Sequence, residues 1–169
     1  MCFDGVDDYL INQDMPLLTD FTVITRRTCL GDAGALAYKG SGKDFNIGEA
    51  GAFQIEILYN RENVITNIML NKRTDIRDYG RITTKDEAVS FTPTSVYKGL
   101  EYEQNFERVE KEDGPILKIN SPLYANNYYT ITMKYFAIYN KTLSDEDIKI
   151  ETKKLEIIWS SRLLNNQLN

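Results

Sequence analysis

Residues 129–159, YTITMKYFAIYNKTLSDEDIKIETKKLEIIW, decide the fold because they read as a strand that runs into a helix. Alternate residues over 129–139 are apolar, which predicts a strand with one face on a core. The opposite face also becomes apolar at Phe136 and Ile138, so we expect both faces to be covered there. The alternating apolar residues, which we expect to face the core, are Tyr129, Ile131, Met133, Tyr135, Ala137 and Tyr139.

The helix start carries three local signals. Ser144 is a capping residue, and Asp147 stands where the acid of a capping box belongs. Leu143 and Ile148 have the spacing of a hydrophobic staple across the first turn. Further along, one apolar stripe at helical spacing comprises Ile148, Thr152, Leu155, Trp159 and Leu163. We expect Leu155 and Trp159 to close one end of the β-structure.

The rest of the chain reads as roughly ten short strands separated by turn signals. With the single helix at the end, this pattern predicts an all-β fold, an antiparallel two-sheet sandwich with a C-terminal α-helix. The side chains that we expect between the two sheets are Phe21, Val23, Phe53, Ile55, Ile57, Ile131, Met133 and Tyr135.

Composition excludes several functional classes. The chain has 169 residues and a net charge of -5, without a basic patch, so we expect no nucleic-acid partner. No apolar run is long enough to span a bilayer, and the acidic start MCFDGVDDYL lacks the features of a signal peptide. The absence of histidine excludes His-dependent triads and the usual His-based zinc sites. Cys2 and Cys29 could pair, although free, buried thiols are the commoner state.

Both ends of the chain resemble one family. The segments FDGVDDY (residues 3–9), DFTV (20–23) and FAIYNKTLSDEDI (136–148) are similar to the opening, the next strand and the closing strand of the laminin G-like, concanavalin A-like jelly roll. Tyr97-Lys98-Gly99 resembles its central turn. The resemblance implies a module over residues 1–159, followed by a helical extension or tail over residues 160–169.

The family resemblance implies a non-catalytic recognition module for a carbohydrate or a cell-surface polymer. Such modules recur in phage fibres and bacterial surface proteins, so we expect a virion, extracellular or cell-surface location. Virion release by lysis also agrees with the missing signal peptide. The alternative is a structural assembly domain that docks on neighbouring subunits and has no glycan ligand.

Two groups of residues are candidate binding sites. Asp4, Asp7 and Asp8 could contribute hard carboxylates to a calcium site, as in several relatives, or instead satisfy backbone N–H groups in a turn. The loop tyrosines could stack on sugar rings, or instead serve as packing residues. These tyrosines are Tyr79, Tyr102, Tyr124 and Tyr128.

We expect no catalytic residues. Glucanases share this fold, which leaves a degenerate glycoside hydrolase as a third hypothesis, but retaining hydrolysis needs two carboxyl groups about 5 Å apart. No acid spacing in the sequence provides such a pair, and the acidic stretch reads as a solvated charge run. Its members are Glu101, Glu103, Glu107, Glu110, Glu112 and Asp113.

The end of the chain is unusually apolar. Leu163, Leu164 and Leu168 follow the predicted end of the module. An exposed apolar excess marks partner surfaces, so we expect residues 160–169 to continue the helix and pack on protein subunits of a larger assembly. A disordered terminus is the competing interpretation.

Overall fold

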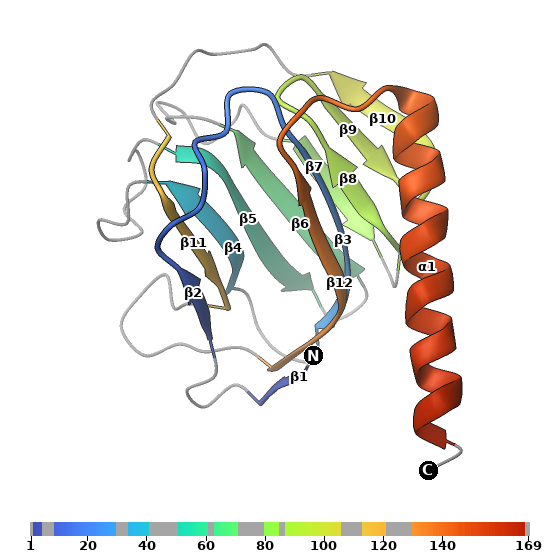
Figure 1. Ribbon diagram of the computed structural model, residues 1–169. Coiled ribbons are helices and arrows are strands. Elements are labelled where there is room, and N and C mark those ends of the chain that lie inside the picture. Colours follow the sequence, from blue (N-terminus) through green and yellow to red (C-terminus); the bar gives the residue numbers. More distant parts are fainter. Residues whose placement is uncertain are drawn as a thin grey trace.

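The computed structural model describes residues 2–4, 9–29, 34–40, 51–60, 63–70, 80–84, 87–105, 113–120 and 130–167. Over these residues the chain forms twelve β-strands and one C-terminal α-helix (Figure 1). The strands form two six-stranded sheets, and neighbouring strands pair antiparallel throughout. The predicted all-β, antiparallel two-sheet architecture with a C-terminal α-helix is therefore confirmed.

The two sheets have the following strand orders. Sheet A contains β1 (Cys2–Asp4), β12 (Thr130–Tyr139), β3 (Thr22–Cys29), β8 (Val89–Phe91), β9 (Ser95–Lys98) and β10 (Glu101–Asn105). Sheet B contains β2 (Leu10–Asn12), β11 (Ile116–Ile119), β4 (Gly34–Gly40), β5 (Gly51–Asn60), β6 (Asn63–Leu70) and β7 (Gly80–Thr84). The last strand, β12, thus lies between the two N-terminal strands β1 and β3.

An aromatic cluster joins the two sheets. Phe53 of β5 lies 5.4 Å from Phe91 of β8 and 5.6 Å from Phe21, measured between ring centroids. All three rings are buried, as are Val23 and Met133. The predictions for Phe21, Val23, Phe53 and Met133 are therefore confirmed. The side chains of the other predicted aliphatic core residues, Ile55, Ile57 and Ile131, are outside the part of the chain that the structure describes.

A bulge at Lys134 changes which face of β12 meets the core. Met133 pairs with Arg27 of β3, whereas Tyr135 pairs with Arg26, so one extra residue is inserted between them. A one-residue shift exchanges the two faces of a strand. Tyr135 is accordingly half-buried, and its hydroxyl donates a 2.5 Å hydrogen bond to Glu156 of the helix. The prediction that Tyr135 lies between the sheets was wrong, because simple alternation does not register a bulge.

The helix α1 (Asp145–Gln167) begins where its signals predicted. The Asp147 N–H donates to Ser144 Oγ at 3.2 Å, and the Ser144 hydroxyl donates to Asp147 Oδ2 at 2.8 Å. Leu143 and Ile148 are buried in one cluster with Tyr97. The predicted cap and hydrophobic staple are both confirmed.

The helix covers the outer face of sheet A (Figure 1). The Tyr97 hydroxyl of β9 donates to Asp145 Oδ1 at 2.7 Å, and Arg26 Nη1 of β3 lies 2.5 Å from Glu156 Oε2. These residues stand on the face opposite the aromatic cluster, because side chains alternate along a strand. Leu155 and Trp159 are half-buried, and Trp159 lines a cavity together with residues of both sheets. The expectation that they close one end of the sandwich stays a prediction.

A buried ion pair ties β4 to the segment before β11. Lys39 Nζ lies 2.7 Å from Asp113 Oδ2, and the side chains are 0% and 5% exposed. The Leu18 N–H donates to the same oxygen at 2.8 Å, and the Gly114 N–H donates to Asp113 Oδ1. Asp113 therefore does not belong to a solvated charge run, and that interpretation was wrong for this residue.

The topology separates the two cysteines. Cys2 of β1 pairs with Thr132, and Cys29 of β3 pairs with Ile131, so β12 runs between them. Two strand spacings place their backbones about 10 Å apart, beyond the reach of a disulfide. The thiols therefore do not pair within the chain.

Among the described residues, no helix is long and apolar enough to cross a membrane.

Candidate functional site

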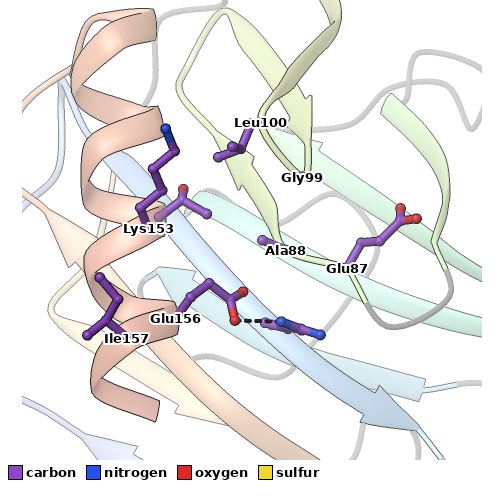
Figure 2. Close-up of a pocket in the computed structure, with 9 residues that line it drawn as sticks. Glu87, Ala88, Gly99, Leu100, Lys153, Glu156 and Ile157 are labelled. Atoms are coloured by element: carbon purple, nitrogen blue, oxygen red, sulfur yellow. Dashed lines mark hydrogen bonds and ion pairs between the residues drawn. The ribbon is translucent and has the colours of Figure 1, made fainter. Parts of the chain in front are cut away.

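A groove lies between α1 and the hairpin of β9 and β10 (Figure 2). We call it the α1 groove, and its volume is about 510 Å³, within the range of small-ligand sites. Its lining residues are Arg26, Glu87, Ala88, Gly99, Leu100, Thr152, Lys153, Glu156 and Ile157.

The hairpin wall is shaped by Gly99. Lys98 pairs with Glu101, so Gly99 and Leu100 form a two-residue loop. The φ angle of Gly99 is +60°, the geometry of a type II′ turn with glycine in its first central position. The Gly99 N–H donates to the Ala88 carbonyl at 2.8 Å, and nothing lies within 4 Å of where a Cβ would stand. A ligand could therefore approach the backbone closely.

The helix wall combines polar and apolar groups. Thr152, Lys153, Glu156 and Ile157 lie on adjacent turns of α1 and line the groove. Figure 2 shows Glu156 directed toward the strands of sheet A. Thr152 is only 2% exposed, and its Oγ1 has no hydrogen-bond partner among the described residues. A buried hydroxyl without a partner costs about 1–3 kcal/mol, so a ligand that bonds it would recover this energy.

The charges around the groove are balanced. Glu156 accepts a hydrogen bond from Tyr135 on Oε1 and pairs with Arg26 on Oε2. Glu87 Oε2 lies 3.5 Å from Lys98 Nζ. With Lys153, the lining contributes two cations and two acids. Because both oxygens of Glu156 are engaged, the groove suits binding of a polar, uncharged molecule better than proton transfer by a free carboxyl group.

The described lining of the α1 groove includes none of the residues that the sequence singled out as candidate binding residues. Tyr79, Tyr124, Tyr128, Asp7 and Asp8 are outside the described residues. The backbone of Tyr102 pairs with Tyr97, and that of Asp4 pairs with Thr130, while their side chains are outside the described part. Within the described ranges, no three potential metal ligands come together. The tyrosine site and the calcium site both stay predictions.

The sequence analysis did not predict the α1 groove, because the segments that form its walls are far apart in the sequence. Two signals pointed to parts of it. Gly99 ends the Tyr97-Lys98-Gly99 turn, and Thr152 interrupts an otherwise apolar helical stripe. Neither signal shows that the two segments meet. Glu101, from the acidic stretch, lies exposed on β10 and does not line the groove.

Solved structures share this fold at low sequence identity. A heptameric SAP-like pentraxin from Limulus polyphemus has a TM-score of 0.65 at 12% identity, over 88% of this chain and 78% of the pentraxin. The ligand-binding domain of botulinum neurotoxin serotype D, solved with N-acetylneuraminic acid, has a TM-score of 0.58 at 14% identity. That match covers 90% of this chain and 41% of the toxin domain.

A sialidase from Trypanosoma rangeli also contains this fold. Its TM-score is 0.60 at 15% identity, over 88% of this chain and 26% of the sialidase. No protein-family model and no curated protein matches the sequence. At these identities the structures establish the architecture alone, so the narrower laminin G-like resemblance stays a prediction. The chain has the antiparallel jelly-roll fold found in lectin-like domains.

Proposed function

We propose that this chain is a non-catalytic recognition module that binds a carbohydrate in the α1 groove. The observation that carries the proposal is an open groove on a jelly-roll fold whose surface is mostly apolar, with a few polar groups at defined positions. The serotype D toxin domain, 41% of which matches this chain, was solved with N-acetylneuraminic acid. That likeness supports the ligand class, while the groove chemistry of this chain defines the site.

The groove lining matches the two sides of a sugar ring. Ala88, Leu100 and Ile157 supply apolar surface for the C–H groups of a ring. Glu87 can accept hydrogen bonds from hydroxyls, and Lys153 can donate to them. The buried Thr152 hydroxyl can do both. Because the cations and acids of the lining balance, we expect a neutral glycan rather than an acidic one.

A glycan array with added calcium, and again with a chelator, tests the ligand class. Titration calorimetry with the best ligand then tests the site, using Ile157→Arg and Ile158→Arg. Ile157 lines the groove, whereas the adjacent Ile158 does not, and both are exposed, at 66% and 50%. We expect Ile157→Arg to weaken binding about tenfold or more, because it removes apolar surface and adds a charge to the groove, and Ile158→Arg to bind as the parent does.

Each outcome has a distinct meaning. If a glycan binds the Ile157→Arg and Ile158→Arg variants equally, its binding site lies outside the α1 groove. The predicted tyrosines would then be the next candidates, tested by Tyr102→Ala and Tyr124→Ala. Dependence on calcium would support the predicted site at Asp4, Asp7 and Asp8. No binding to any glycan under either condition would refute the carbohydrate proposal.

A structural assembly domain is the second proposal. It is supported by exposed apolar side chains on α1, since Ile150 and Ile158 are 40% and 50% exposed. In either case we propose display on a virion or a cell surface, as in modules of the family that the sequence resembles. Protease added to intact virions or cells would cleave a displayed module and spare an internal one.

A further inference from the structure

A second cavity, of about 480 Å³, lies at the edge of β12. Its lining includes Phe136 and Ile138, which pair with Thr25 and Val23 and therefore face the space between the sheets. The lining also includes Tyr135, which pairs with Arg26 and donates to Glu156 of α1, so it lies on the opposite face of sheet A. A cavity that reaches both faces of one strand must lie beside the edge of that strand.

The backbone of this edge is open over its second half. β1 pairs with β12 only from Thr130 to Thr132. From Phe136 to Tyr139, β12 pairs with β3 on one side, and no strand among the described residues pairs with the other side. Alternate residues of such an edge direct their N–H and C=O groups outward, about two residues in this stretch. An unpaired edge is a template for another strand.

We propose that an extended peptide segment of a partner protein adds a strand to this edge of β12. The added strand would continue the β1–β12 ladder along Phe136–Tyr139. Strand addition uses main-chain hydrogen bonds for affinity and pockets for alternate side chains for specificity. The two sides of the cavity therefore define the sequence of the partner.

Where the cavity faces the space between the two sheets, it favours apolar side chains on the added strand. Leu10, Met15 and Ile138 border the cavity there, and Leu10 is 42% exposed on β2, the edge strand of sheet B. Side chains of an added strand would cover this apolar surface. Burial of aliphatic side chains here favours binding and fixes the register, because a shift by one residue would turn them away from the apolar surface.

The side toward α1 requires acidic residues. Arg162 is exposed and lines the cavity, and no acid appears among the lining residues that the structure describes. Trp159 provides an adjacent flat surface. The partner segment would therefore alternate apolar residues with Asp or Glu. A basic segment would meet like charge.

A peptide library tests the proposal directly. The probes are fluorescein-labelled peptides of about eight residues, slightly longer than an average strand, that alternate Val, Ile or Leu with Asp or Glu. Fluorescence polarisation would measure affinity, and hydrogen exchange would report protection of amides in residues 134–139. The best peptide is then N-methylated at odd or at even positions. We expect one pattern to abolish binding and the other to preserve it, because only alternate amides of an edge strand face its partner.

Charge variants complete the test. Arg162→Glu should weaken binding of the acidic peptide about threefold or more, while Lys149→Glu, an equal charge change on the same helix at a residue that does not line the cavity, should leave it unchanged. The proposal is overturned if no library peptide binds below about millimolar concentration, the range of weak strand addition. Equal binding of both N-methylated forms also overturns it. So does protection of residues 134–139 by dimerisation alone, since the occupant would then be a second copy.

Discussion

Lys39 Nζ on β4 and Asp113 Oδ2 lie 2.7 Å apart inside the protein, and the lysine side chain is fully buried. Removing one partner of such a pair leaves an uncompensated buried charge, at a cost of about 3–5 kcal/mol. We therefore expect Lys39→Met to lower the urea midpoint strongly. The double variant Lys39→Met/Asp113→Leu should recover part of the loss, because it buries no charge. A double variant less stable than either single variant would contradict this account.

The Ser144 cap makes a smaller contribution. Ser144→Ala removes the acceptor for the Asp147 N–H and should lower the free energy of unfolding by about 1 kcal/mol. Ser160→Ala is the control, since Ser160 donates only back to the Glu156 carbonyl within the exposed part of α1, and its loss should be nearly neutral. Urea denaturation of both variants decides the point. Equal stability of the two would show that the cap contributes nothing measurable.

The Tyr139–Glu151 hydrogen bond predicts a pH dependence at the alkaline end. Burial and the Glu151 carboxylate raise the pKa of Tyr139 from 10.0 to about 12. The folded state therefore holds this proton more tightly than the unfolded state does. The resulting stabilisation is complete below pH 10 and is lost as pH rises toward about 12. Tyr139→Phe should flatten this part of the stability profile.

Absorbance of tyrosinate checks the same assignment directly. A titration of the parent should show one group ionising late, and Tyr139→Phe should remove that late step. Glu151→Gln removes the negative charge and should move the ionisation of Tyr139 to lower pH. If the late ionisation is still present in Tyr139→Phe, the raised pKa belongs to another tyrosine.

The carboxylates that the structure describes in the α1 groove are all engaged in ion pairs or hydrogen bonds. In the groove, Glu156 is engaged on both oxygens and Glu87 pairs with Lys98. We expect no turnover of common polysaccharides by reducing-sugar assay. Turnover that disappears in Glu87→Gln or Glu101→Gln would reassign the chain to the hydrolases.

The end of α1 is expected to mediate assembly. Its backbone is helical through Gln167, beyond the last contacts with sheet A described above. We expect removal of residues 160–169 to leave the fold intact and to weaken self-association or docking, because Leu163, Leu164 and Leu168 are lost. Light scattering and circular dichroism of both forms check this. Two monomers of equal stability, with no partner that distinguishes them, would contradict it.

The sequence predicted those features that depend on neighbouring residues. The cap at Ser144 and the staple of Leu143 and Ile148 involve a single turn, and both were read correctly. The fold class followed from strand count and turn spacing. The face of β12 after Lys134 was misread, because a bulge adds one residue without changing the apolar composition. The groove and the Lys39–Asp113 pair depend on contacts between distant segments, which no local pattern encodes.

The place of β12 in sheet A has a consequence for how the protein is made. β1, at the start of the chain, joins sheet A only through β12, which ends at Tyr139. While the ribosome is still synthesising β12, sheet A cannot form its complete hydrogen-bond ladder, and β3 exposes one edge. Contacts so distant in sequence also slow folding. Sheet A therefore closes only after residues 130–139 have been synthesised, and until then the unpaired edge of β3 is a site at which nascent chains can associate.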